Sequence, residues 1–217
     1  MLTQAIQDYI KTIYKLRGSG DGVTTTAIAE RMGVSAASAT NMVKKLARLR
    51  LVEHTPYRSV VLTPGGEKVA LEVIRHHRLL ELYLSDVLGV SLDKVDGEAE
   101  RLEHVLSEEL EERIAQTLGD PTHDPHGHPI PSREGRLDES SFPVLADLRG
   151  GAAATIVHVS DQDAAVLRRL AADGLLPGTH LRVVKVDDAG GMHVRLDGGE
   201  RHVSRELAQA VQVTTRD

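Results

Sequence analysis

The sequence has no cysteine and no tryptophan, and its 217 residues include only one phenylalanine and four tyrosines. Without cysteine, disulfide bonds, thiolate metal sites and cysteine nucleophiles are excluded. No stretch approaches the roughly 18 consecutive apolar residues of a transmembrane helix, and the N-terminal residues lack the basic-then-apolar pattern of a signal peptide. We therefore expect a cytoplasmic protein without a membrane partner, whose core consists of Leu, Val and Ala.

Charge is distributed unevenly along the chain, which has a net charge of −6. Residues 1–65 hold nine Lys or Arg and four Asp or Glu, whereas the remainder holds 17 and 28. A basic head on an acidic body predicts that only the N-terminal part contacts a polyanion such as nucleic acid.

Apolar periodicity predicts helices over residues 2–16, 25–32 and 35–49. The short Gly33-Val34 turn between the second and third is typical of a helix-turn-helix. The third helix is expected to bury Ala39, Met42, Val43 and Leu46. An ordinary amphipathic helix pair without a DNA-binding role is the alternative interpretation.

Two β-like runs, residues 51–54 and 59–63, predict a hairpin after the third helix, as in a winged helix-turn-helix. Asn and Thr can bond base edges or phosphates, and Lys and Arg suit phosphates. The predicted DNA contacts are Thr26, Ser35, Ala36, Ala37, Ser38, Thr40, Asn41, Lys44, Lys45, Arg48 and, in the wing, Arg58.

Residues 98–113 are predicted to form a helix that combines an apolar stripe with acidic residues. The stripe consists of Ala99, Leu102, Leu106 and Leu110. Beside it, Glu100, Glu103 and His104 span an arc of roughly 100° and can converge on one divalent cation. A solvated acidic face with a surface histidine is the alternative.

A long helix is predicted over residues 64–88, in which His77 and Glu81 lie one turn apart, a chelating spacing. A hydrogen-bonded core histidine is the alternative for His77. A further helix is predicted over residues 93–118. The two helices together expose more apolar surface than packing against the small N-terminal domain would bury, so we expect them to form a dimerisation surface.

The segment 119–150 is rich in Pro, Gly and Asp and contains His123, His126 and His128, which either bind metal or lie in a solvated loop. Beyond it, short strands separated by glycine turns, with a helix over 163–172, predict a small β-barrel. The expected strands are residues 153–159, 181–186, 192–196, 201–203 and 210–213.

Taken together, these segments resemble the diphtheria toxin repressor family of metal-dependent transcriptional regulators, which includes the manganese transport regulators. The resemblance covers nearly the whole chain and is carried by DYIKTIY (8–14), IAERMGVSAASATNMVKKL (28–46), LVEHTPYRSVVLTPGG (51–66), RHHRLLELYL (75–84), EAERLEHVLSEELEERI (98–114) and DPHGHPIP (124–131). It implies an α+β fold with three domains. These are a winged helix-turn-helix at 1–65, a helical dimerisation and metal-binding domain at 66–140, and an SH3-like (FeoA-like) barrel at 150–217.

The resemblance also implies an activating metal site formed by Asp8, Glu100, Glu103 and His104. Iron-type members have methionine and cysteine where this chain has Asp8 and Glu100, whereas manganese-type members have these carboxylates. Hard oxygen ligands favour Mn²⁺ without excluding Fe²⁺.

A neighbouring site in the family corresponds to His77, Glu81 and Asp96, with Asp161 or Asp163 from the C-terminal domain. Manganese-type members have a further glutamate where this chain has Lys11, which cannot ligate while charged. We therefore expect one or two ions per subunit.

The implied function is a repressor that binds double-stranded operator DNA as a metal-loaded homodimer and controls metal-uptake genes. It has no small-molecule substrate and is not an enzyme. Two alternatives stay open: a winged-helix regulator with an organic effector, and a metalloenzyme in which the ion activates water. No nucleophile accompanies the acidic cluster, and an enzyme would leave the basic head unexplained.

Overall fold

The computed structural model describes residues 2–17, 23–54, 59–138 and 140–215. The chain divides into two compact units. The first unit comprises residues 1–77, 103–106 and 131–137, and the second comprises residues 78–102, 107–130 and 138–217. The predicted wing contact Arg58 lies outside the described residues.

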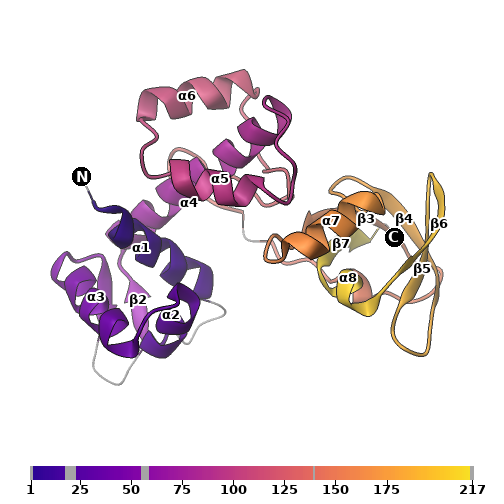
Figure 1. Cartoon of the computed structure of the whole chain (residues 1–217), viewed down its shortest axis with the longest axis horizontal. Helices are drawn as coiled ribbons and strands as arrows, with labels where there is room; N and C mark the ends of the chain where they lie inside the picture. The colour runs from indigo at the N-terminus through magenta and orange to yellow at the C-terminus, as the bar shows by residue number, and fades with distance from the viewer. Residues whose placement is uncertain (1, 18–22, 55–58, 139, 216–217) are drawn as a thin grey trace. The chain divides into compact units, whose positions relative to one another are not determined.

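The first unit begins with the predicted helix-turn-helix and hairpin (Figure 1). Its elements are α1 (Gln4–Leu16), α2 (Thr25–Met32), α3 (Ala36–Arg48), β1 (Val52–His54) and β2 (Val60–Leu62). The two strands pair antiparallel, with Glu53 opposite Val61. The winged helix-turn-helix prediction is confirmed, with helix ends within two residues of those expected.

Local capping explains where α2 and α3 begin. The Thr24 hydroxyl accepts a hydrogen bond from the Ala27 amide at the start of α2, and the Ser35 hydroxyl accepts one from the Ser38 amide at the start of α3. Gly33 ends α2 in the left-handed region at φ 63°, where a side chain would be strained. Each polar cap contributes about 1 kcal/mol, so this turn is encoded locally.

Packing of α1 supplies much of the core of the first unit. Ile6, Ile10 and Ile13 are buried on one face, and they meet Val43 and Leu46 of α3 in the same apolar cluster. Each such side chain contributes roughly 1.5–3 kcal/mol relative to an exposed position. The polar residues of α1 lie off this stripe and make polar contacts within the first unit.

Helix α4 (Pro64–Asp86) ends two residues before the predicted limit. Its first turn is fixed by Thr63, whose hydroxyl accepts a hydrogen bond from the Gly66 amide at 3.1 Å. Although α4 has 23 residues, no helix in the described ranges is long and apolar enough to cross a membrane.

The predicted continuous helix over residues 93–118 is wrong, as is its core segment 98–113. The structure has α5 (Val95–Leu102) and α6 (Glu108–Thr117), separated by a turn at residues 103–106 that belongs to the first unit. Ser107 caps α6 by accepting a hydrogen bond from the Leu110 amide, which competes with a continued helix. As a result, Leu102 and Leu110 are 40% and 50% exposed instead of sharing a buried stripe.

The C-terminal region forms one antiparallel sheet in the order β6-β5-β4-β3-β7. Its elements are β3 (Ala153–Val159), α7 (Ala164–Ala172), β4 (His180–Val186), β5 (Met192–Leu196), β6 (Gly199–Val203), α8 (Arg205–Gln209) and β7 (Val211–Thr215), after the short η1 (Leu145–Asp147). The predicted strands are confirmed, whereas α8 and η1 were not predicted. The SH3-like sheet is open, because β6 and β7 lie at its two edges and do not pair within the described ranges.

Substitution of Gly66 by Ala tests the packing of α4 against the wing. A Cβ at Gly66 would lie 1.9 Å from the backbone oxygen of Leu51, so backbone must shift. We expect Gly66→Ala to lower the free energy of unfolding by roughly 1–3 kcal/mol in a denaturant titration. The matched variant Gly65→Ala has no contact closer than 3.7 Å and should be neutral or slightly stabilising. Equal stability of the two variants would contradict this account.

Candidate metal centre and nucleic-acid interface

The carboxylate of Glu103 is buried in the first unit and holds the turn after α5 in place. The Lys11 ammonium donates to both carboxylate oxygens, at 2.9 and 2.7 Å, and His77 Nδ1 lies 2.5 Å from Oε2. The relative exposures of Lys11, His77 and Glu103 are 4%, 3% and 1%. His76 adds a contact from its Nδ1 to the Glu103 carbonyl at 3.2 Å. Two consecutive histidines of α4 therefore fix both the side chain and the backbone of Glu103.

These partners keep Glu103 ionised despite its burial. Desolvation by itself raises the pKa of a buried carboxyl group, but the hydrogen bond from His77 and the charge of Lys11 outweigh it and hold the pKa of Glu103 below its usual value. A charged oxygen is thus available at neutral pH.

His104 follows in the same turn and faces α1. Its Nε2 lies 2.8 Å from Asp8 Oδ1 and 3.4 Å from Glu103 Oε1, while its Nδ1 lies 2.8 Å from Gln7 Oε1. An amide oxygen only accepts, so the contact with Gln7 places a proton on Nδ1 and leaves Nε2 facing the two carboxylates. Within the described residues, His104 Nε2 makes no hydrogen bond of acceptable geometry.

The donor set fits a divalent ion. The nitrogen His104 Nε2 lies 2.8 Å from the oxygen Asp8 Oδ1 and 3.4 Å from the oxygen Glu103 Oε1. Neighbouring ligands lie roughly 3 Å apart around an octahedral ion with bonds of about 2.1 Å. Two carboxylates and one imidazole suit a hard to borderline cation. The predicted fourth ligand, Glu100, is an exposed residue of α5 three positions before Glu103, and its ligation stays a prediction.

The residues predicted for a neighbouring site have other contacts. His77 directs Nδ1 to Glu103, and the buried Glu81 lies 3.4 Å from His126 Nδ1. Asp96 is half-buried on α5. Asp163 caps α7, where its Oδ1 accepts hydrogen bonds from two backbone amides. A second ion held by these residues stays a prediction.

The loop around Asp124 is more ordered than its composition indicated. Asp124 Oδ1 accepts hydrogen bonds from the amides of His126 and His128, both at 2.9 Å, and Oδ2 lies 3.3 Å from His128 Nδ1. Burial raises the pKa of Asp124, but the His128 contact outweighs it and lowers the pKa to about 2. His126 is fully buried and its Nε2 lies 3.2 Å from the Leu92 carbonyl, whereas His123 is exposed. The interpretation as a solvated loop is wrong for His126.

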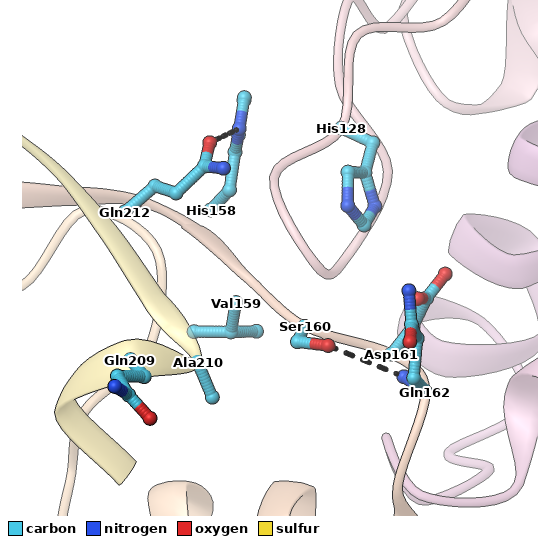
Figure 2. A pocket seen from close by; sticks show the side chains of 9 residues that line it. All are labelled: His128, His158, Val159, Ser160, Asp161, Gln162, Gln209, Ala210 and Gln212. Atoms are coloured by element: carbon cyan, nitrogen blue, oxygen red, sulfur yellow. Dashed lines mark hydrogen bonds between the residues drawn. The ribbon is translucent and has the colours of Figure 1, made fainter. Parts of the chain in front are cut away.

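A pocket of about 280 Å³ adjoins this loop in the second unit. Figure 2 shows His128 on one side, with Ser160 and Asp161 on the strand end opposite and Gln212 bonded to His158. Burial lowers the pKa of His128, but the Asp124 hydrogen bond and the charge of Asp161 raise it overall. Of the two predicted C-terminal ligands, Asp161 thus lines a polar pocket, while Asp163 serves as a cap.

The exposed face of α3 carries the residues predicted to meet DNA. Asn41, Lys44, Lys45 and Arg48 are exposed, and so are Thr26 on α2 and the residues from Ser35 to Ser38. The hydroxyl of the half-buried Thr40 donates to the Ala36 carbonyl at 2.8 Å, which leaves its lone pairs for an outside donor. Small residues at the start of α3 allow close approach to a groove, although the individual DNA contacts stay predictions.

Three family models match successive parts of the chain. Residues 1–60 match "Iron dependent repressor, N-terminal DNA binding domain", residues 63–132 match "Iron dependent repressor, metal binding and dimerisation domain", and residues 144–215 match "FeoA domain".

Similar proteins span nearly the same length. The iron-dependent repressor IdeR of Mycobacterium tuberculosis is 32% identical over 226 residues, which cover 98% of this chain and 97% of that protein. The diphtheria toxin repressor of Corynebacterium glutamicum is 32% identical over 222 residues, which cover 98% and 96%. A solved structure described as a manganese-dependent transcriptional repressor in complex with manganese is 39% identical, with a TM-score of 0.89, and the match covers 97% of this chain and 100% of that one.

The contact from Gln7 to His104 predicts a positioning role for Gln7. Gln7→Ala removes the acceptor that fixes the proton on Nδ1, so we expect Mn²⁺ affinity in a calorimetric titration to fall about 10–100-fold. Gln7→Glu keeps an acceptor and should retain most of the affinity. The control Gln4→Ala, at an exposed position of the same helix, should have no effect. Equal affinities of Gln7→Ala and Gln4→Ala would contradict the assignment.

Proposed function

We propose that Mn²⁺ is the co-repressor of this chain, which belongs to the diphtheria toxin repressor family of metal-dependent transcriptional repressors. Members of this family bind DNA, are not enzymes, and regulate metal homeostasis when metal-loaded. The observation that carries the proposal is the approach of Asp8 Oδ1 and Glu103 Oε1 to Nε2 of His104. We assign the ion to Asp8, Glu100, Glu103 and His104.

Ligand chemistry supports manganese over softer ions. Three carboxylates and one imidazole form an oxygen-rich set without sulfur, which suits Mn²⁺ and leaves Fe²⁺ as the second candidate. The manganese-bound relative, 39% identical over nearly the whole chain, agrees with this choice.

Charge balance favours one ion at this centre. Asp8, Glu100 and Glu103 contribute three negative charges, which Lys11 and one divalent ion together neutralise. A second divalent ion beside Lys11 would leave uncompensated positive charge in a buried setting. The Lys11 ammonium contacts both oxygens of Glu103 and therefore supplies a fixed positive charge in place of a second metal ion, as a tethered cation.

A weaker second site is proposed from the remaining predicted ligands. His77, Glu81 and Asp96 are its core, and Asp161 is a better C-terminal ligand than Asp163, whose carboxylate already caps α7. A metal ion at this site requires one ring nitrogen of His77 to ligate it while Nδ1 contacts Glu103. We therefore expect this site to fill only after the first.

We propose a homodimer that positions two recognition helices α3 on successive major grooves, with domains at 1–65, 66–140 and 150–217. The exposed Val87, Leu88, Leu102 and Leu110 lie within the segment matched by the dimerisation model and supply apolar surface for it. Half-sites lie about 34 Å apart, so small errors in helix separation prevent docking of both helices.

Metal regulates this binding by restraining α1. The ligands Asp8, on α1, and Glu103 and His104, in the turn after α5, are drawn together around the bound ion, which fixes the DNA-binding module in one arrangement. Taking that arrangement from about 1% to about 99% of the population requires roughly 5.5 kcal/mol of preferential binding. Several charged ligands around a dication can supply this.

Chelation provides the first test. With operator DNA selected in vitro by the Mn²⁺-loaded protein, we expect EDTA to abolish the mobility shift and added Mn²⁺ to restore it. Asp8→Met should weaken the response to Mn²⁺ more than the response to Fe²⁺, since it replaces a hard ligand by a soft one. Glu206→Gln, at an exposed position of α8, serves as the control. Unchanged DNA binding after chelation and in Asp8→Met would favour an organic effector instead.

Lys11→Glu tests the proposed ion count. The introduced carboxylate replaces the tethered cation, so we expect the Mn²⁺ stoichiometry measured by calorimetry to rise by one ion per subunit. The metal-free variant should unfold at lower temperature, because buried carboxylates repel one another without a cation. Lys15→Glu makes the same charge change at an exposed position of α1 and should leave the stoichiometry unchanged. An unchanged stoichiometry in Lys11→Glu would refute the argument from charge balance.

A further inference from the structure

A further group of side chains that could ligate a metal ion lies in the C-terminal region, where Asp187, His193 and His202 come together. One ligand atom from each residue lies within 4.8 Å of the others. His193 on β5 and His202 on β6 are directly opposite in the antiparallel register, and their ring centroids are 5.1 Å apart. The neighbouring pair Met192 and Val203 is fully buried, so the two histidines project from the opposite, solvent-facing side of the sheet.

Asp187 is held in a position in which its second carboxylate oxygen faces His202. It follows β4, and its Oδ1 accepts hydrogen bonds from the amides of Ala189 and Gly191, at 2.9 and 2.8 Å. Its Oδ2 points to His202, whose Nε2 lies 3.0 Å away. Two ligands of a tetrahedral ion with bonds of about 2.05 Å lie roughly 3.3 Å apart, close to this separation.

Gly191 allows the Asp187 carboxylate and the His202 imidazole to pack closely against the backbone. A Cβ at this position would lie 2.6 Å from Asp187 Oδ2 and 2.9 Å from His202 Nε2. No positive φ requires glycine here. The absence of a side chain therefore permits the approach of the carboxylate to the imidazole.

We propose that Asp187, His193 and His202 form a site for Zn²⁺ and related late transition ions. Two imidazoles and one carboxylate match the three-ligand sets that hold zinc with an open position, and imidazole favours these ions over Mn²⁺. The bound ion would join the edge strand β6 and its neighbour β5 to the turn after β4. The site shares no residue with the proposed manganese centre. Its two imidazoles favour Zn²⁺, whereas the carboxylates of the other centre favour Mn²⁺.

The test uses the full chain with its regulatory centre first saturated by Mn²⁺. We expect Zn²⁺ to shift the imidazole ¹⁵N resonances of His193 and His202 and to raise the unfolding temperature. His193→Gln and His202→Gln should each lose one equivalent of bound Zn²⁺. The control His180→Gln, at an exposed histidine of β4 that bonds Thr155, should keep it.

Gly191→Ala sharpens the test, because it retains all three ligands and should still weaken Zn²⁺ binding. Mn²⁺-dependent operator binding should be unchanged in every variant, which separates failure of this site from failure of the proposed repressor function. The proposal is overturned if Zn²⁺ leaves the two wild-type imidazole resonances unshifted, or if His202→Gln binds as much Zn²⁺ as His180→Gln.

Discussion

Burial of the Glu103 carboxylate against Lys11 and His77 is the interaction on which the candidate metal centre depends. Desolvating a carboxylate and an ammonium costs several kcal/mol per ion, and only close hydrogen bonds to both oxygens offset that cost. Loss of one partner from such a buried pair typically costs about 3–5 kcal/mol. This interaction holds the turn at 103–106 against α1 and α4, and thereby directs His104 towards Asp8.

Helix α1 consequently belongs both to the core of the DNA-binding region and to the candidate metal centre. The apolar face of α1, with Ile10 and Ile13, belongs to the same core cluster as the buried residues of α3. Its polar residues Gln7 and Asp8 contact His104, and Lys11 contacts Glu103. In the mechanism that we propose, a metal ion would therefore act directly on a helix of the DNA-binding core.

Where local patterns dominate, the sequence was a good guide to the fold. Periodicity, caps and turn glycines encode α2, the turn at Gly33 and α3, because each signal acts within a few residues. Strands β3 and β5 were predicted with the observed limits for the same reason. The break between α5 and α6 was missed, since an apolar stripe continued through Leu102 and Leu110 and outweighed the cap signal at Ser107.

The sequence by itself determined the kinds of ligand available: carboxylates and imidazoles, with no thiolate, in a pattern that resembles a known family. Only the tertiary structure decided their partners. Lys11 meets Glu103 across 92 positions, and Gln7 meets His104 across 97. Periodicity cannot encode contacts over such separations, because they depend on how complete helices pack. The buried state of His126 and the roles of Lys11 and Gln7 therefore appear only in the folded chain.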